Sequence, residues 1–282
     1  MRYSLAVIAA IAAHVSAHGV ITEIQGANKV TMPGLSVADG TPRDCANPLC
    51  GSEQDTSIIR DREMGTAKAS ALGRTQDGPV DADKAIAMFM GGGNAANKKR
   101  QLEELLGGGK ADGGDAAAAK DATGQKTADG AKEQGVAKAA GTGASSGLPT
   151  ASDSGEVTMT FHQVNQDGAG PLKAQIDATS GGKDPAAFKD AQVTQDVPGI
   201  GIGGLSGAST TDFPVKVQMP AGMTCSGSAG GASNVCVVKV MNAALAGPFG
   251  GSAAFTQSDA GRKRAVEYNL RKRHMARGVL GK

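Results

Sequence analysis

The sequence predicts a mainly β protein, an antiparallel β-sandwich. Several short segments alternate apolar and polar side chains with the two-residue period of a strand, and turns rich in Gly and Pro separate them. With 42 Gly among 282 residues, no Trp and 3% aromatic residues, the chain cannot form one dense core along its whole length. The segments that predict strands are 20–24, 156–164, 172–176, 213–219 and 235–240.

The N-terminus predicts a signal peptide over residues 1–17. A short cationic start precedes an apolar run, Leu5–Ala13, that is too short to span a bilayer, and small residues precede the bond after Ala17. Cleavage there makes His18 the first residue of the mature chain. A cut after Ala13 would leave His14 first instead, but it fits the small-residue rule less well.

The remaining chain divides by composition into two parts of a sandwich domain, residues 18–93 and 151–258, separated by a low-complexity insert over 94–150. Between 107 and 147 the insert is rich in Gly and Ala, and Val136 is its only large apolar side chain. Such a segment buries too little surface to offset its chain entropy. We therefore expect a disordered insert.

Within the first part, 20–24 has strand composition, and Asp81 can cap a short helix that runs through Phe89 and stops at three glycines. In the second part, alternation places Val157 and Phe161 on the apolar face of a strand and His162 on its polar face. Asp184-Pro185 can open one helical turn further on.

The C-terminal residues 259–282 predict a basic helical tail. From Gly261 onward eight basic residues stand against one acidic residue, so the rest of the chain is mildly acidic although the net charge is only +2. The chain as a whole is therefore not expected to bind nucleic acid through bulk charge. No later apolar run approaches the length of a membrane span.

Three basic clusters, 98–100, 262–264 and 271–273, are candidate cleavage sites for a kexin-type processing protease. The alternative is that each is an ordinary solvated run of charge. For the tail, a third possibility is an anchor to acidic wall polymers or anionic lipid.

All four cysteines follow the signal peptide, in a region that an oxidising compartment would cross-link. Four cysteines allow three pairings, and we favour Cys45 with Cys50 and Cys225 with Cys236 because each closes a short loop. A zinc site is disfavoured, since the spacings are not those of a knuckle and no histidine lies nearby.

Only three histidines remain after cleavage: His18, His162 and His274. A terminal histidine offers a metal its α-amine and its ring nitrogen, and a second imidazole completes a three-nitrogen site that suits copper. His162 is the natural partner because it lies on the polar face of its strand. The alternative is that both are ordinary solvated residues. His274 stands among basic residues and is read as part of the tail.

Several sequence blocks closely resemble the Egh/Gas/Mas family of secreted fungal proteins, which are associated with appressoria and virulence. The N-terminal blocks are His18-Gly-Val-Ile-Thr-Glu-Ile-Gln-Gly-Ala-Asn, Val30-Thr-Met-Pro-Gly-Leu-Ser-Val-Ala-Asp-Gly-Thr-Pro-Arg-Asp-Cys45 and Asp55-Thr-Ser-Ile-Ile-Arg-Asp-Arg-Glu63. The C-terminal blocks are Thr158-Met-Thr-Phe-His-Gln-Val-Asn165, Asp167-Gly-Ala-Gly-Pro171, Thr211-Asp-Phe-Pro214 and Ala246-Gly-Pro-Phe-Gly-Gly251. Lys29 departs from the expected glycine, and the insert matches in composition alone.

The His-Gly start and the strand histidine also resemble the copper histidine brace of lytic polysaccharide monooxygenases. This resemblance implies an immunoglobulin-like sandwich, with copper held by His18 and His162 and activating oxygen or peroxide against a polysaccharide. It implies an axial aromatic residue, either Phe249 or Phe255, of which Phe255 is slightly preferred. Gln163 or Gln257 would orient the oxygen species.

The scarcity of aromatic residues argues against cellulose, because exposed Tyr or Trp rings usually grip flat polysaccharide crystals. Trp is absent, and Tyr268 is the one Tyr left after signal cleavage. Chitin, glucan, pectin and cutin-rich surfaces stay open as substrates. The alternative function is a non-enzymatic surface or matrix protein of the infection structure.

Overall fold

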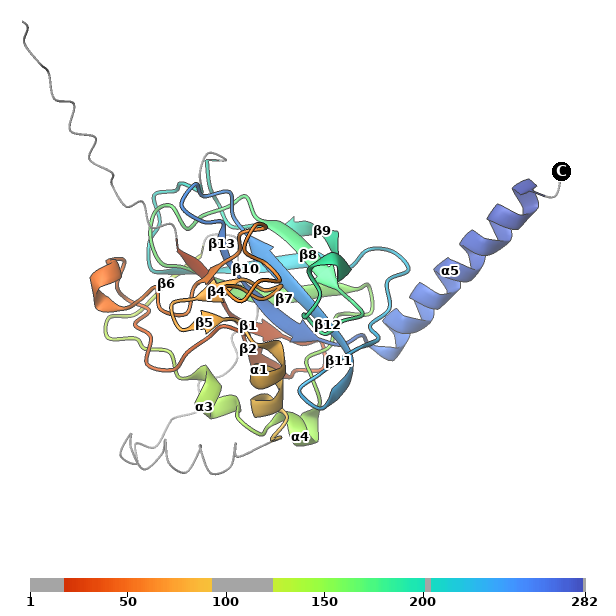
Figure 1. Cartoon of the computed structure of the whole chain (residues 1–282), viewed down its shortest axis with the longest axis horizontal. Coiled ribbons are helices and arrows are strands. Elements are labelled where there is room, and N and C mark those ends of the chain that lie inside the picture. Colours follow the sequence, from red (N-terminus) through yellow and green to blue (C-terminus); the bar gives the residue numbers. More distant parts are fainter. Residues whose placement is uncertain (1–17, 93–123, 201–203, 281–282) are drawn as a thin grey trace, which may run out of the picture.

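In the computed structural model, which describes residues 18–92, 124–200 and 204–280, the strands form one continuous antiparallel sheet. Its order is β2-β1-β7-β10-β9-β8-β12-β13-β3-β4-β5, with β11 paired to β12 and β6 paired to β10 (Figure 1). Strands from the first part of the chain therefore lie at both edges of the sheet and flank a central block of strands from the second part. The strands are β1 (Gly19–Gln25), β2 (Thr31–Pro33), β3 (Ser57–Ile58), β4 (Arg74–Thr75), β5 (Gly78–Pro79), β6 (Gln125–Lys126), β7 (Glu156–Gln163), β8 (Lys173–Asp177), β9 (Phe188–Gln195), β10 (Thr211–Gln218), β11 (Gly227–Ala229), β12 (Ala232–Met241) and β13 (Phe249–Phe255).

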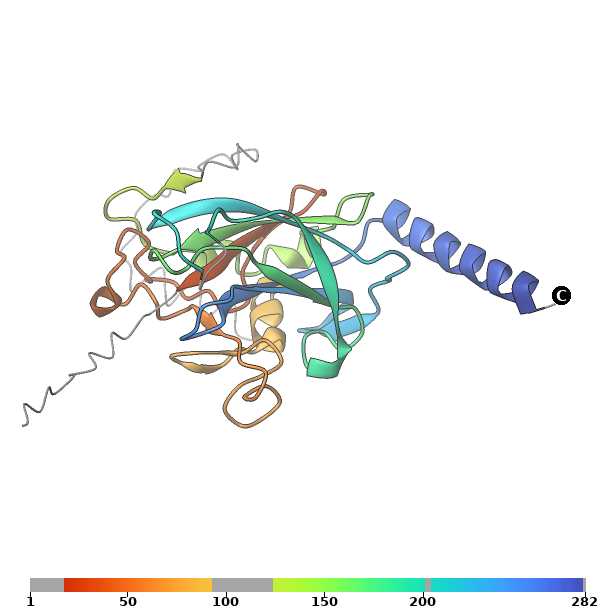
Figure 2. The same ribbon diagram turned by 90° about the horizontal axis from the view of Figure 1, so that it is seen from above.

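The sheet curls so that its two halves pack face to face, with β9 joining them (Figure 2). The two halves approach closely where β13 crosses β1, since a Cβ atom on Gly251 would lie 2.5 Å from the backbone nitrogen of Ile21. The core between the halves holds Phe161, Phe213 and Phe255. The prediction of a mainly β, antiparallel fold is confirmed, whereas the immunoglobulin-like arrangement is not, because the described strands follow one hydrogen-bonded path.

Helices lie outside the sheet, and they include α1 (Ala82–Phe89), α3 (Gly135–Ala139), α4 (Gly143–Ser146) and α5 (Asp259–Leu280), with short 3-10 turns at Pro48–Cys50 and Pro185–Ala187. The predicted cap of α1 is present: the Asp81 side chain accepts a hydrogen bond from the backbone N–H of Lys84 at 3.0 Å. Asp184 likewise accepts from Ala186 N at 2.9 Å and opens the expected turn. The basic tail is a helix, as predicted, and it begins at Asp259.

The expectation of a disordered insert is wrong for residues 124–150. Arg43 donates hydrogen bonds to Glu133 at 2.9 and 3.1 Å, and Asp39 accepts from the backbone N–H groups of Val136 and Ala137 at 3.0 and 2.7 Å. Leu148 belongs to the core. Polar anchors supplied by the first part of the chain thus hold a segment whose own composition cannot form a core. Residues 94–123, the rest of the expected insert, lie outside the described residues.

Both predicted disulfides, Cys45–Cys50 and Cys225–Cys236, are present. The expected signal peptide and the basic cluster 98–100 lie outside the described residues. The other two basic clusters sit within the continuous helix α5, a conformation that must unwind before a protease can bind it. Within the described part of the chain, no helix combines the length and the apolar character needed to cross a membrane.

Candidate functional site

Strand pairing brings His18 and His162 to the same end of the sheet. Val20 of β1 lies opposite His162 of β7, and the backbone N–H of Val164 donates to the carbonyl oxygen of His18 at 3.0 Å. The two histidines are therefore diagonal neighbours on adjacent strands, a relation in which residues lie about 7–8 Å apart.

The His162 ring is oriented by an acidic residue that sequence reasoning did not identify. Asp212 of β10 stands directly opposite His162, and its Oδ1 atom lies 2.7 Å from His162 Nδ1. A carboxylate at this distance holds the ring proton on Nδ1, which leaves the lone pair on Nε2. His162 has no exposed surface, and its Nε2 atom is buried without a hydrogen-bond partner. The histidine is on the polar face of its strand, as predicted, but it is buried.

The nitrogen atoms of His18 meet a linked pair of polar side chains. The backbone nitrogen of His18 donates to Asn165 Oδ1 at 2.9 Å, and Nδ1 lies 3.0 Å from Glu53 Oε1 in an orientation that does not form a hydrogen bond. Asn165 Nδ2 in turn donates to the same Glu53 oxygen at 3.3 Å. Both nitrogens of His18 therefore face the linked side chains of Asn165 and Glu53.

Asp167 adds negative charge beside this group. Its pKa is raised, chiefly by burial, with the Glu53 carboxylate adding to the increase and the charge of His18 opposing it. The surroundings of His18 are therefore anionic as well as buried, an environment that favours a cation over an anion.

The two candidate axial residues, Phe249 and Phe255, lie at opposite ends of β13. The Phe249 ring stands 4.4 Å from the His18 ring, centroid to centroid, at an interplanar angle of 34°. Phe255 is six residues further along the strand, roughly 20 Å away, and pairs with Cys236. Phe249 is the residue that reaches His18, although Phe255 was preferred from the sequence.

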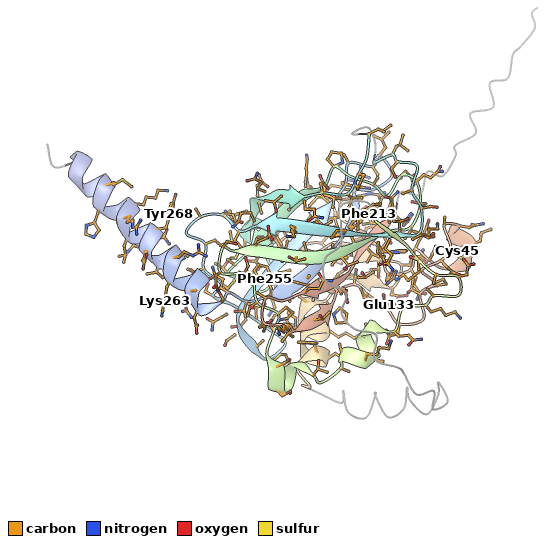
Figure 3. The ribbon with its side chains drawn as sticks, turned by 180° about the vertical axis from the view of Figure 1, so that it is seen from behind. Cys45, Glu133, Phe213, Phe255, Lys263 and Tyr268 are labelled. Carbon is orange, nitrogen blue, oxygen red and sulfur yellow. A yellow bond between two sulfur atoms is a disulfide. The ribbon has the colours of Figure 1, made fainter. Side chains whose placement is uncertain are left out.

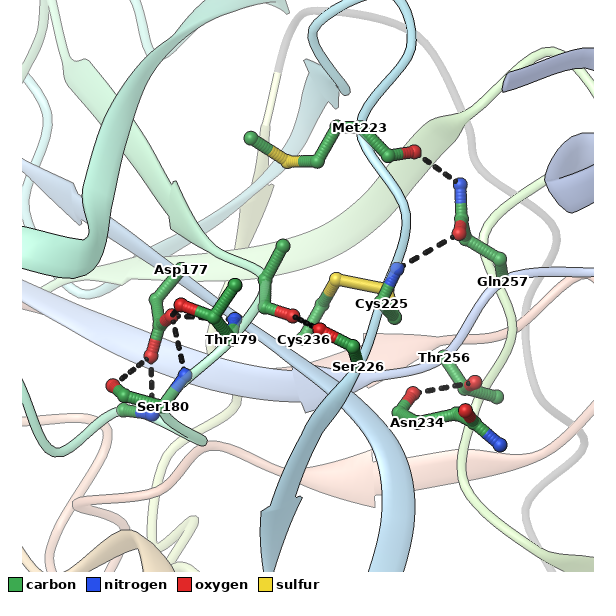
Figure 4. The surroundings of a disulfide bond; sticks show 12 residues. Asp177, Thr179, Ser180, Met223, Cys225, Ser226, Asn234, Cys236, Thr256 and Gln257 are labelled. Atoms are coloured by element: carbon green, nitrogen blue, oxygen red, sulfur yellow. Dashed lines mark hydrogen bonds between the residues drawn. A yellow bond between two sulfur atoms is a disulfide. The ribbon is translucent and has the colours of Figure 1, made fainter. Parts of the chain in front are cut away.

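Gln163 and Gln257 both hold backbone in place. The Gln163 side chain donates to Asn165 O, Ser206 Oγ and Ala208 O at 2.8–2.9 Å, which ties the loop before β10 to the end of β7. Gln257 lies beside the Cys225–Cys236 disulfide (Figure 4). Its side chain accepts a hydrogen bond from Cys225 N at 2.9 Å and donates one to Met223 O at 2.9 Å. Gln257 therefore lies with Phe255, at the end of β13 away from His18.

The residues can be tested for their fit to a copper ion. No group of three or more His, Cys, Asp and Glu side chains arranged to hold a metal occurs among the described residues. The proposed donor set is different, however, because it needs two imidazoles and a terminal amine. His18 Nδ1 and His162 Nε2 are both buried without hydrogen-bond partners, and such orphaned nitrogens fit a metal ligand.

Sequence reasoning missed Glu53, Asn165 and Asp212. Asn165 and Asp212 lie inside the sequence blocks that carry the family resemblance, and this position could have marked them as candidate site residues. Nothing in the sequence marks Glu53, because it reaches His18 from a loop. A model of one protein family matches residues 16–250 and therefore covers all these residues.

The chain belongs to the Egh16-like virulence factor family. Among curated relatives of this Egh16-like chain, "Appressoria-specific virulence factor GAS2" of Pyricularia oryzae is 57% identical over 295 residues, covering 99% of this chain and 97% of the relative. "Appressoria-specific virulence factor GAS1" of the same fungus is 43% identical over 109 residues, covering 39% of this chain and 42% of the relative. No solved structure shows a significant match. The family is thus virulence-associated and appressorium-specific by its named members.

Proposed function

We propose that the mature chain begins at His18, is secreted, and binds one copper ion through His18 and His162, and that this site acts oxidatively on an extracellular polysaccharide. The observation that carries the proposal is a pair of buried ring nitrogens on adjacent strands that accept or donate no hydrogen bond, His18 Nδ1, which lies 3.0 Å from Glu53 Oε1, and His162 Nε2. Two disulfides support an oxidising compartment.

His18 supplies two of the proposed donors. Its backbone nitrogen, which donates to Asn165, becomes a primary amine once the preceding bond is cut, and it lies beside the ring nitrogen of the same residue. The amine has an ordinary pKa of about 8, so a metal can displace its proton near neutral pH.

His162 supplies the third donor. Asp212 fixes the ring proton on Nδ1, so that Nε2 presents its lone pair without a change of tautomer. Glu53 and Asn165 lie beside the proposed donors of His18, where they hold the ring and the amine in place. Phe249 closes one side of the His18 ring and keeps water from it.

Bound copper would supply redox chemistry, activating oxygen or peroxide so that a hydrogen atom is removed from a glycosidic carbon. The protein's contribution is a fixed set of nitrogen donors in a buried, anionic end of the sheet. The low aromatic content of the surface argues against flat crystalline cellulose as the substrate.

The proposal is tested by titrating Cu²⁺ into protein that starts at His18. We expect one ion per chain, measured by electron paramagnetic resonance and calorimetry. His18→Ala and His162→Ala should each lose at least about tenfold in affinity, because loss of a residue that merely orients a metal ligand already costs about 10–100-fold. His274→Ala is the matched control, because this third histidine lies exposed on α5.

A second control separates the amine from the ring. One glycine added before His18 keeps both imidazoles but removes the terminal amine from the chelate, so binding should weaken as much as in His18→Ala. Equal affinity in the extended and native proteins, or unchanged affinity in His162→Ala, would contradict the proposed donor set.

The second candidate function is a non-enzymatic surface or matrix protein of the infection structure. Its support is the scarcity of exposed aromatic side chains that could grip a carbohydrate chain; among the described residues with large exposed apolar side chains, Tyr268 is the only aromatic one. Reductant-dependent peroxide production by the copper-loaded protein would favour the enzyme. Copper binding without such turnover would favour the second candidate.

A further inference from the structure

The C-terminal helix α5 is a cationic arm that leaves the body of the protein. Figures 1 and 2 show it projecting beyond the sheet, and Figure 3 places Lys263 and Tyr268 on the side of the molecule opposite Cys45. Its first half is held to the body: Ala265 is buried, and Asn269 Nδ2 donates to Gly222 O at 2.8 Å. From Leu270 to Met275 the side chains are exposed.

Positive charge surrounds this arm. The triplets Arg262–Arg264 and Arg271–Arg273 contribute six cationic side chains, all exposed, whereas the described acidic residues on the helix are Asp259 and Glu267. The triplets are nine residues apart, which places them about 13 Å apart along the axis and on opposite sides of the helix. A linear polyanion that follows the arm would therefore meet cationic groups wherever it crosses the helix.

The exposed apolar side chains of the arm do not form a membrane-binding face. Val266 and Leu270 lie on one side of the helix, whereas Tyr268 and Met275 lie on the other, as their spacings of four and seven residues require. A helix that lies in a lipid interface needs one continuous apolar face opposite its charges. The arm therefore fits a hydrated polymer better than a bilayer.

We propose that α5 is a docking arm for a carboxylate-bearing polysaccharide. Charge complementarity supplies the attraction, and the four described arginines can pair with carboxylates in the bidentate manner that lysine cannot adopt. The two disulfides place the protein in an oxidising compartment, where such acidic polymers are the partner rather than nucleic acid. The proposal is independent of copper, because the arm lies at the end of the molecule away from His18.

The test uses the full mature chain and polygalacturonate as the probe. The variant is the triple substitution Arg271→Gln, Lys272→Gln and Arg273→Gln, on the half of the helix that leaves the body. The matched control removes the same charge from the body, at Lys132→Gln, Lys173→Gln and Lys189→Gln, three exposed lysines. Circular dichroism and the melting temperature verify that each variant keeps its fold.

We expect wild type and the control to bind polygalacturonate at low salt and the helix variant to bind about tenfold more weakly. Added salt should remove most of the difference, since exposed charges are screened. Equal binding by the helix variant and the control would overturn the proposal.

Three other probes identify the occupant. Tighter binding to phosphatidylserine vesicles or to DNA than to polygalacturonate would overturn the proposal, as would salt-sensitive self-association that the helix variant abolishes, because the arm would then dock on a second copy. Weaker binding to the vesicles and to DNA than to polygalacturonate, no binding to an uncharged glucan and no salt-sensitive self-association would support it.

Discussion

Two ring nitrogens buried at the histidine end of the sheet, His18 Nδ1 and His162 Nε2, have no hydrogen-bond partner. Buried polar atoms are nearly always hydrogen-bonded, and leaving one unpaired costs about 1–3 kcal/mol. His162 Nε2 bears this cost while Asp212 satisfies the other nitrogen of the ring. The ring is thus held in one orientation and one tautomer.

Asp212→Asn tests the role of this carboxylate as a positioning residue. The substitution keeps an acceptor of similar shape but removes the charge, so we expect copper affinity to fall about tenfold or more. Calorimetric titration measures it, and the copper spectrum should change as the ring is freed. Asp129→Asn, on an exposed turn, is the control. An unchanged affinity and spectrum in Asp212→Asn would show that the pair serves stability alone.

Lys239 is a second buried polar residue, and its environment makes stability depend on pH. Its Nζ atom donates to Ala71 O at 3.1 Å and lies 4.0 Å from the centroid of the Phe188 ring. Burial is the main cause that lowers its pKa to about 8, and the charges of Asp61 and Asp177 oppose the decrease. Above pH 8 the unfolded chain therefore binds more protons at this residue than the folded chain does.

Stability should consequently rise between pH 8 and the ordinary lysine pKa near 10.5, because the cost of burying the charged amine disappears. Thermal melts across this range measure the rise. In Lys239→Met we expect this contribution to vanish, so that the melting temperature of the variant changes less with pH. If the melting temperature of the wild type changed with pH in parallel with that of Lys239→Met, Lys239 would not be the source of the pH dependence.

Among the secondary-structure elements, the folded segment 124–150 depends on a buried ion pair made with the first part of the chain. Arg43 donates to Asp55 Oδ1 at 2.9 Å as well as to Glu133, and all three side chains are largely buried. Removing the cation would leave two carboxylates facing each other without a partner.

Arg43→Met should therefore lower the free energy of unfolding by about 3–5 kcal/mol in urea titrations. The control is Lys183→Met, which breaks the Lys183–Asp83 pair at the surface, where both side chains are about half exposed. That change should cost at most about 1 kcal/mol. Similar losses in the two variants would show that the Arg43 cluster does not hold the segment.

The sequence correctly predicts those elements whose pattern is contained in a short stretch of neighbouring residues. Alternation identifies β7 and β10, a capping residue starts α1, and loop length favours the disulfide pairs. Segment 124–150 carries no local signal, because residues distant in sequence hold it. The meeting of Asp212 with His162 depends on strand order and register, which one strand's alternation does not specify.

At the scale of the whole molecule, the first part of the chain supplies both edges of the sheet and the second part supplies its centre. β1 pairs with β7, and β3 pairs with β13, so each part completes the other's sheet. The disulfides, in contrast, are local to each part, at Cys45–Cys50 and Cys225–Cys236. In a chain cut between the two parts, the shared sheet therefore holds the pieces together under native conditions, whereas no disulfide joins them once they unfold.

A cut after Arg100 tests this difference. The two pieces should elute together in gel filtration, because the shared sheet holds them, and should separate on a denaturing gel even without reductant. The reduced sample should give the same two bands as the unreduced one. Pieces that part under native conditions, or stay joined until reduced, would contradict the topology or the disulfide pairing.

The pairing of β1 with β7 also bears on the proposed cleavage before His18. His18 is buried and contacts Asn165, which lies 147 residues further along the chain, so its surroundings do not exist until that later segment has been delivered. A peptidase that frees the amine of His18 must work on the nascent, unfolded chain. Processing and folding thus compete in time, and the long sequence separation between these partners gives processing the earlier opportunity.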